Sequence, residues 1–130
     1  MAEDFGCAHC WPPTADAAWE AREPLTPGTT LVDESHYAVW IPACPHCGQD
    51  FVSVFTEIID WMSGSDSQFS TRLPITKAEA ADLIGRGDAL TEGVLEALGP
   101  DRRCLMHDFP RSATVPQNLW GVGISIGLHD

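Results

Sequence analysis

The sequence predicts an α+β fold in which an antiparallel β-sheet is built on a hairpin with a cysteine-containing turn. Two runs rich in β-branched and aromatic residues, 36–41 and 51–61, flank the turn at 42–48. A later segment, 77–98, carries helix-start signals and an apolar stripe. The chain has 130 residues, the length of one ordinary domain, so we expect a single domain over 1–130.

The segment before the first predicted strand is expected to be irregular. A short cysteine loop at 5–11 is followed by residues 12–30, where Pro12, Pro13, Pro24, Pro27 and Gly28 interrupt regular structure. We therefore expect an extended loop over 12–30. Within it, only 15–22 is compatible with one or two helical turns.

A third strand and the helical region follow the hairpin. The third strand is predicted at 68–75, because alternate residues from Phe69 to Ile75 form one apolar face. Thr76 and Glu79 then have the spacing of a capping box, which predicts a helix over 77–86. A second short helix is expected between Leu90 and Leu98, whose apolar residues share one stripe.

The carboxyl-terminal segment is predicted to be a loop and then a strand. Two prolines within 102–117 favour a loop there. From Leu119 to Leu128, apolar residues alternate with glycine and serine, which predicts a closing strand. Because the glycine face has no side chains, we expect another part of the chain to lie close against it.

The net charge argues against two classes of partner. Nineteen acidic residues face seven basic residues, and the formal charge is −12. Nucleic acids and anionic membranes attract clustered Lys and Arg, so neither is an expected partner. Residues 1–71 carry eleven acidic residues and only Arg22 as a base. This half of the chain therefore favours a basic protein partner.

The sequence shows neither a secretory signal nor a membrane span. Its acidic start lacks a basic segment followed by an apolar run, and no apolar stretch approaches the roughly 20 residues of a span. We therefore expect a cytoplasmic protein. Because that compartment is reducing, metal binding or redox chemistry is a more natural use of five cysteines than disulfides.

Four of the five cysteines occur as two Cys-x-x-Cys pairs. Cys7 and Cys10 form the first pair, Cys44 and Cys47 form the second, and 33 residues lie between the pairs. Two such turns supply the four thiolates that tetrahedral Zn²⁺ needs and leave no open coordination position. Gly48 can adopt the positive φ that closes the second turn. The sequence therefore predicts a structural Zn²⁺ that ties the amino terminus to a zinc-knuckle hairpin.

The two motifs resemble the paired knuckles of zinc ribbon and rubredoxin-like modules. The match covers Cys7-Ala-His-Cys10 and Cys44-Pro-His-Cys-Gly48. The resemblance implies a small β-sheet clamped by one zinc ion and a role in contacts with proteins or nucleic acids. His9 and His46 take the same place in both motifs, and we expect them to be exposed turn residues that point away from the metal.

A second metal site is an open alternative. Cys104 and His107 have the spacing of metal ligands, and they could replace one cysteine pair or form another site with His9 or His46. The competing interpretation is a buried Cys104 beside a surface histidine. Three arginines around this pair could clamp an anion or form salt bridges with acidic residues: Arg102, Arg103 and Arg111.

Thiol redox chemistry is the other chemical alternative. Cys44-Pro-His-Cys47 resembles, in these four residues, the motif of oxidising thioredoxin-like enzymes. Such a cysteine needs the start of a helix to lower its pKa, whereas a strand is predicted here. No nucleophile elbow, phosphate-binding loop or zinc-protease helix occurs in the sequence. We therefore favour a non-catalytic protein-interaction module, with an enzyme or metal-handling protein as the alternative.

Overall fold

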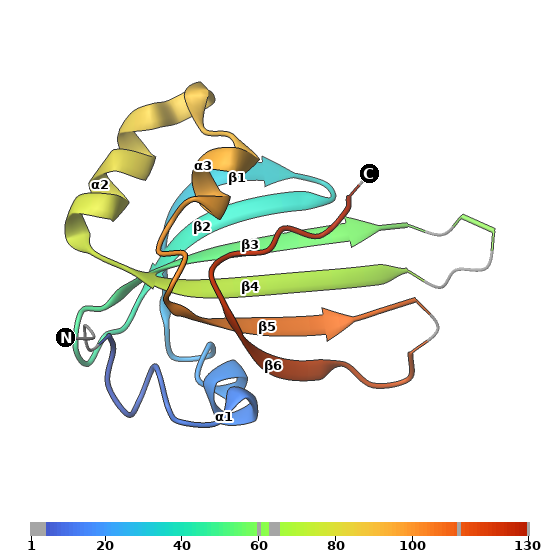
Figure 1. Ribbon diagram of the computed structural model, residues 1–130, viewed down its shortest axis with the longest axis horizontal. Helices are drawn as coiled ribbons and strands as arrows, with labels where there is room; N and C mark the ends of the chain where they lie inside the picture. Colours follow the sequence, from blue (N-terminus) through green and yellow to red (C-terminus); the bar gives the residue numbers. More distant parts are fainter. Residues whose placement is uncertain (1–4, 60, 63–65, 112, 130) are drawn as a thin grey trace.

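The computed structural model describes residues 5–59, 61–62, 66–111 and 113–129 and has an α+β architecture (Figure 1). Within these residues, six strands form one antiparallel sheet whose spatial order equals the order along the chain. The strands are β1 (Thr26–Glu34), β2 (Tyr37–Ala43), β3 (Asp50–Ile58), β4 (Ser67–Ile75), β5 (Arg103–Phe109) and β6 (Gln117–Val122). The helices are α1 (Ala15–Glu20), α2 (Lys77–Arg86) and α3 (Glu92–Glu96), with a 3-10 turn η1 (Gly87–Ala89).

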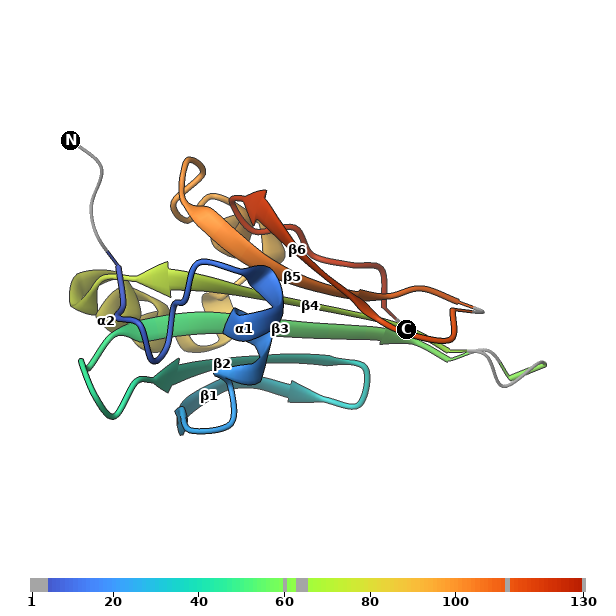
Figure 2. The same ribbon diagram turned by 90° about the horizontal axis from the view of Figure 1, so that it is seen from below.

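The two faces of the sheet have different covers. On one face, side chains from β2 to β5 form the main core with α2, α3 and the segment after β6, which crosses the sheet in Figure 1. The buried members of this core are Tyr37, Val39, Ile41, Val52, Val54, Leu73, Ile75, Ala80, Leu83, Leu95, Cys104 and Ile124. The other face is covered in part by α1, which packs on β5 and β6 and lies in front of the strands in Figure 2.

The three predicted central strands are confirmed. They correspond to β2, β3 and β4, and their register places Val39 opposite Val54 and Val52 opposite Leu73. Strand β3 ends at Ile58, earlier than the predicted 61. The turn between β2 and β3 carries Cys44 and Cys47, so the paired cysteine motif lies at one end of the sheet.

Helix α2 has the predicted bounds. Thr76 Oγ1 accepts a hydrogen bond from the Glu79 amide at 3.1 Å, and the Glu79 carboxylate accepts one from the Thr76 amide at 2.8 Å. The predicted capping box is therefore confirmed. Helix α3 is the expected second short helix, and it buries Leu95. No helix among the described residues is both long and apolar enough to cross a lipid bilayer.

The expectation of an extended loop over 12–30 is wrong where strand β1 begins. Helix α1 forms within this range, where helical turns were compatible with the sequence, and the Thr14 side chain caps it. Strand β1 begins at Thr26, and its pairing with β2 shifts register around Pro27 and Gly28. A proline and a bulge are tolerated because β1 is an edge strand. Gly28 has φ +63°, and a Cβ there would collide with the Ile41 carbonyl oxygen.

The predicted carboxyl-terminal elements need two corrections. The loop expected over 102–117 contains strand β5, and the closing strand predicted for 119–128 ends at Val122. Gly123, with φ +74°, turns the chain away from the sheet edge, and the following segment then crosses the main core. The expected close approach at the glycine face is confirmed at Gly121, where a Cβ would collide with the Met106 side chain.

Candidate metal centre

The fold brings the two predicted cysteine pairs together. Cys7 and Cys10 lie in the amino-terminal loop, and Cys44 and Cys47 lie in the turn between β2 and β3. All four Sγ atoms lie within 4.8 Å of one another. The Sγ–Sγ distance is 3.8 Å for Cys7 and Cys10, for Cys7 and Cys44, and for Cys10 and Cys47. These four residues can therefore hold a metal ion.

The sulfur spacing fits one ion at the centre of the cluster. A regular tetrahedron with Zn–S bonds of about 2.3 Å has sulfur–sulfur edges of about 3.8 Å. A disulfide would instead bring two sulfurs to about 2.05 Å. The observed distances of 3.8 Å thus match the edges of a tetrathiolate site.

Each cysteine pair is held in a tight turn by its own backbone. In the first turn, the Trp11 amide donates to the Cys7 carbonyl at 2.8 Å, and the Cys7 amide donates to Cys10 Sγ at 3.2 Å. In the second, the Gly48 amide donates to the Cys44 carbonyl at 2.9 Å. Gly48 has φ +77°, the positive value expected from the sequence. Such turns direct amide hydrogens at the sulfurs and so stabilise thiolates.

The thiols of the cluster differ in environment. Cys10 and Cys44 are buried, whereas Cys47 is exposed. Burial raises the pKa of Cys10. The pKa of the mostly exposed Cys47 is raised by partial desolvation of its thiol and by hydrogen bonds with the Cys7 and Cys44 thiols. Desolvation also acts to raise the pKa of Cys7, but hydrogen bonds from the His9 and Cys10 amides and from neighbouring thiols outweigh it and lower that pKa to about 7. A bound divalent cation would hold all four groups as thiolates.

Two polar residues that the sequence analysis missed brace the cluster. Gln49 Oε1 accepts from the Gly6 amide at 3.0 Å, and Gln49 Nε2 donates to the Ile75 carbonyl at 2.8 Å. Lys77 Nζ donates to the Gly48 carbonyl at 2.7 Å and pairs with Asp50 at 2.9 Å. The only sequence signal for Gln49 is its place directly after the Cys-Pro-His-Cys-Gly motif, and Lys77 gives none.

The cluster rests on a small apolar core of its own. Cys10, Cys44 and Phe51 are its buried members, and Trp11 and Leu25 pack around them. The Trp11 and Phe51 rings lie 5.3 Å apart between centroids. This satellite core is separate from the main core and buries few side chains. A metal ion would therefore supply much of the cohesion at this end of the sheet.

The structure does not bring Cys104 and His107 together. Both lie on β5, but Cys104 is buried in the main core, where burial raises its pKa to about 12. His107 lies on the other face and stacks on Trp19, with ring centroids 3.6 Å apart. Side chains three residues apart on a strand point to opposite faces of the sheet. The Cys-x-x-His spacing can therefore bring two metal ligands together in a turn but not on a strand.

The redox alternative lacks its structural requirement. The residues after Cys47 lead into strand β3, and no helix of the described residues begins at Cys44. Cys44 is also only 3% exposed, whereas a reactive cysteine needs access to solvent.

Of the three arginines considered as an anion clamp, Arg102 pairs with Glu79 at 2.6 Å, and Arg103 lies over the Trp120 ring. Glu79, the partner of Arg102, lies outside the strongly acidic segment 1–71.

Comparison with known proteins identified no relative of this chain. No family model matches the chain, and neither curated proteins nor solved structures gave a match. The function must therefore be inferred from the residues of this chain.

Proposed function

We propose that Cys7, Cys10, Cys44 and Cys47 bind one structural Zn²⁺ and make the turn between β2 and β3 a zinc knuckle. The observation that carries this proposal is the spacing of four sulfurs within 4.8 Å, with three distances of 3.8 Å. Four thiolates favour zinc or iron over magnesium or calcium. They also fill a tetrahedral shell, so the ion has no position for substrate.

The zinc ion would fix the amino-terminal segment to the sheet. The cysteine cluster anchors this segment at the hairpin, and two contacts anchor it at β6. Trp120 Nε1 donates to the Pro13 carbonyl at 3.1 Å, and Asn118 Nδ2 donates to Asp16 at 2.9 Å. Helix α1 is thereby held against β5 and β6. Structural zinc sites contribute on the order of 10–16 kcal/mol in small peptides, so the holo protein should be far more stable than the apo protein.

Metal content of the purified chain and of two cysteine variants tests the proposal. Wild type is expected to hold one zinc per chain, and Cys44→Ser is expected to lose it together with a cooperative thermal transition. The matched control is Cys104→Ala, which removes a buried cysteine outside the cluster and should keep one zinc. A Cys44→Ser protein with full zinc content and an unchanged melting temperature would falsify the assignment.

The same measurement separates zinc from its alternatives. Bound iron would colour the protein through thiolate-to-iron charge-transfer absorption. Bound zinc gives no such absorption. Bound iron would overturn the identity of the ion but not the four-cysteine site. Two metals per chain, or an ion with bound water, would instead support the metal-handling or catalytic alternative.

For the biological role, we propose a non-catalytic module that meets a basic protein partner. Four thiolates and one Zn²⁺ add −4 + 2 charges to −12, so the loaded chain would carry −14. Exposed carboxylates on the amino-terminal half support such a partner, among them Glu20, Asp33 and Glu34. Binding of Lys- and Arg-rich peptides should weaken as salt rises, while acidic peptides of equal length should not bind. Absence of binding to the basic peptides at low salt would count against this role.

A further inference from the structure

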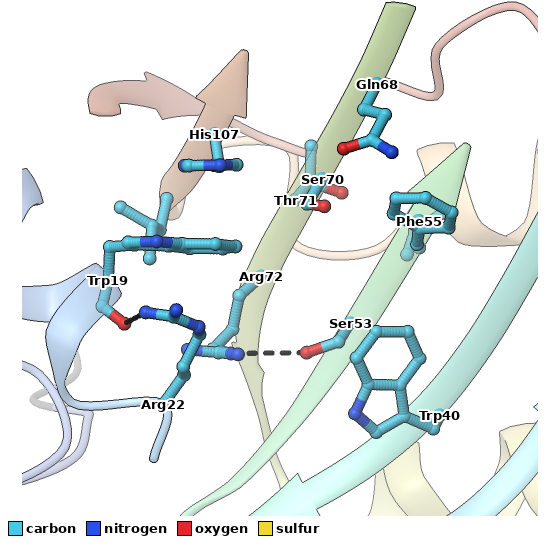
Figure 3. Close-up of a pocket in the computed structure, with 12 residues that line it drawn as sticks. Trp19, Arg22, Trp40, Ser53, Phe55, Gln68, Ser70, Thr71, Arg72 and His107 are labelled. Carbon is cyan, nitrogen blue, oxygen red and sulfur yellow. Dashed lines mark hydrogen bonds between the residues drawn. The ribbon is translucent and has the colours of Figure 1, made fainter. Parts of the chain in front are cut away.

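A cavity lies between α1 and the face of the sheet opposite the main core. Its volume is about 300 Å³, at the lower end for small-molecule sites, and no cysteine lines it. Figure 3 shows that its side chains come from distant parts of the chain: Trp19 of α1, Arg22 after that helix, Trp40 of β2 and Arg72 of β4. The cavity therefore exists only in the folded molecule.

Arg72 is buried in this cavity without a counter-ion. The residue is 7% exposed, and its Nε donates to Ser53 Oγ at 3.2 Å. Its Nη1 atom is buried and has no hydrogen-bond partner. No carboxylate of the described residues forms a salt bridge with it. Burial and the nearby charge of Arg22 lower the pKa of Arg72 to about 10, so the side chain is still a cation at neutral pH.

Arg22 places a second positive charge beside the first. Its Nη1 donates to the Trp19 carbonyl at 2.8 Å, and its guanidinium lies 4.2 Å from the Trp19 ring centroid. In Figure 3 the two guanidinium groups lie next to each other beneath the Trp19 ring. Among the described residues, the salt-bridge partner of Arg22 is Glu23, which is largely exposed and 3.8 Å away, so the pair is weak.

The missing counter-ion of Arg72 is not explained by a shortage of carboxylates. The chain has nineteen acidic residues, and Arg86 and Arg102 each pair with one, at 2.8 Å and 2.6 Å. Two adjacent guanidinium groups repel each other, and burying one of them unpaired is unfavourable. An anion between them would relieve both penalties, so the pair has the character of a binding site.

The rest of the cavity wall is partly aromatic and partly polar, the polar residues being Ser53, Gln68, Ser70 and Thr71. Trp40 and Phe55 lie across from the arginines in Figure 3, and the edge of the Trp19 ring faces the same space. His107 stacks on the far face of Trp19 at 3.6 Å, and its Nδ1 is hydrogen-bonded to Asn118 Oδ1 at 2.6 Å. These contacts hold Trp19 in place. The aromatic part of the wall favours a flat or apolar body attached to the anionic group.

We propose that this cavity binds a small organic carboxylate with a flat apolar body. The carboxylate would lie on the free edge of Arg72 with Arg22 beside it, and the body would pack against Trp19, Trp40 and Phe55. A guanidinium matches a planar carboxylate through two parallel hydrogen bonds, which supports this class of anion. Binding would not involve the metal, so the inference stands apart from the proposed zinc site.

Titration of the zinc-loaded protein with four probes tests the anion and the body separately. The probes are benzoate, its uncharged analogue benzamide, acetate and inorganic phosphate, followed by tryptophan fluorescence and calorimetry. Benzoate should bind, and benzamide and acetate should bind at least about tenfold more weakly, because each lacks one half of the recognition. Benzamide binding as tightly as benzoate would overturn the anion site. Phosphate binding more tightly than benzoate would overturn the carboxylate assignment.

Two arginine variants and one control locate the site. Arg72→Met should lose at least about tenfold in benzoate affinity, and its melting temperature should equal or exceed that of wild type because an unpaired buried charge is removed. Arg22→Met should also weaken benzoate binding. It tests the site independently if the Arg72→Met protein does not fold. Arg86→Met, whose arginine pairs with Asp82 on α2, should bind as wild type does. All three should keep one zinc. The proposal would be overturned if Arg72→Met bound benzoate with unchanged affinity, or if wild type bound no benzoate at millimolar concentration.

Discussion

The His9 and His46 rings stack on each other, with centroids 4.0 Å apart and planes 19° from parallel. The two residues hold the same place in the two cysteine motifs, and both are exposed as the sequence predicted. Neither belongs to the four-cysteine cluster. The stacked rings therefore join the two motifs on the outside, while the sulfurs face each other inside.

This arrangement predicts that the histidines are dispensable for the metal. The double variant His9→Ala with His46→Ala should keep one zinc per chain, because all four ligands remain. Loss of the stacking contact should cost about 0.5–1.5 kcal/mol at most, since both rings are exposed. Metal analysis and thermal unfolding check both statements. A double variant with no zinc would mean that a histidine replaces a cysteine as ligand.

A second prediction concerns Glu79, which accepts from the Thr76 amide and from two nitrogen atoms of Arg102, at 2.6 and 3.1 Å. Partial burial acts to raise the pKa of Glu79, but the hydrogen bonds and charge of Arg102 and the Thr76 amide outweigh it and lower that pKa. Glu79→Gln should therefore reduce stability by about 1 kcal/mol at neutral pH.

The pH dependence of this loss has a definite sign. A carboxyl whose pKa is lowered by folding stabilises the protein above its unfolded pKa, and this contribution disappears as pH falls through the folded value. The stability difference between wild type and Glu79→Gln should thus shrink below about pH 4. Urea unfolding at several pH values measures it. Asp82→Asn, which removes an exposed pair with Arg86, should cost less than Glu79→Gln at neutral pH.

A third prediction uses two glycines with opposite surroundings. Gly28 has φ +63°, and a Cβ there would meet the Ile41 backbone, so Gly28→Ala should destabilise the protein by about 2 kcal/mol or more. Gly85 lies inside α2 with open space around its Cα, so Gly85→Ala should stabilise by about 0.5–1 kcal/mol. Equal effects of the two changes would show that the bulge in β1 is not formed as described.

A fourth prediction concerns metal removal. Chelation should lower the melting temperature and change the tryptophan emission, because Trp11 packs on the buried cysteines and on Phe51. In the Trp11→Phe variant the emission change should be much smaller, while zinc content stays at one per chain. Emission that is unaffected by chelation in wild type would indicate that the satellite core does not depend on the metal.

The elements predicted correctly are those with local signals. The capping box gave the start of α2, and alternating side chains gave the central strands. Strand β1 was missed because it is an exposed edge with Pro27 and Gly28 near its start, and these residues signal a loop. Strand β5 was missed because both of its faces are covered, which removes the alternation that would mark it: Cys104 and Leu105 are both buried.

The two candidate sites also differ in whether a local sequence signal marks them. The cysteine cluster could be predicted because each motif is four residues long and supplies two ligands from one turn. The cavity around Arg72 could not, because its walls come from α1 and four strands. On sequence alone, Arg72 occupies the polar face of an alternating strand, where exposure to solvent is the natural expectation. Only the packing of the amino-terminal segment on that face reveals a buried charge.

The order of the sheet also bears on how the chain folds. Each strand pairs with its neighbour in the sequence, so the sheet can assemble one hairpin at a time from local contacts. The amino-terminal segment instead meets β6 across separations of 102 and 107 residues. Closing such long loops is slow relative to forming hairpins, so docking of α1 on β6 should come late in folding. During synthesis, the contacts of Pro13 and Asp16 with β6 cannot form until that strand has left the ribosome.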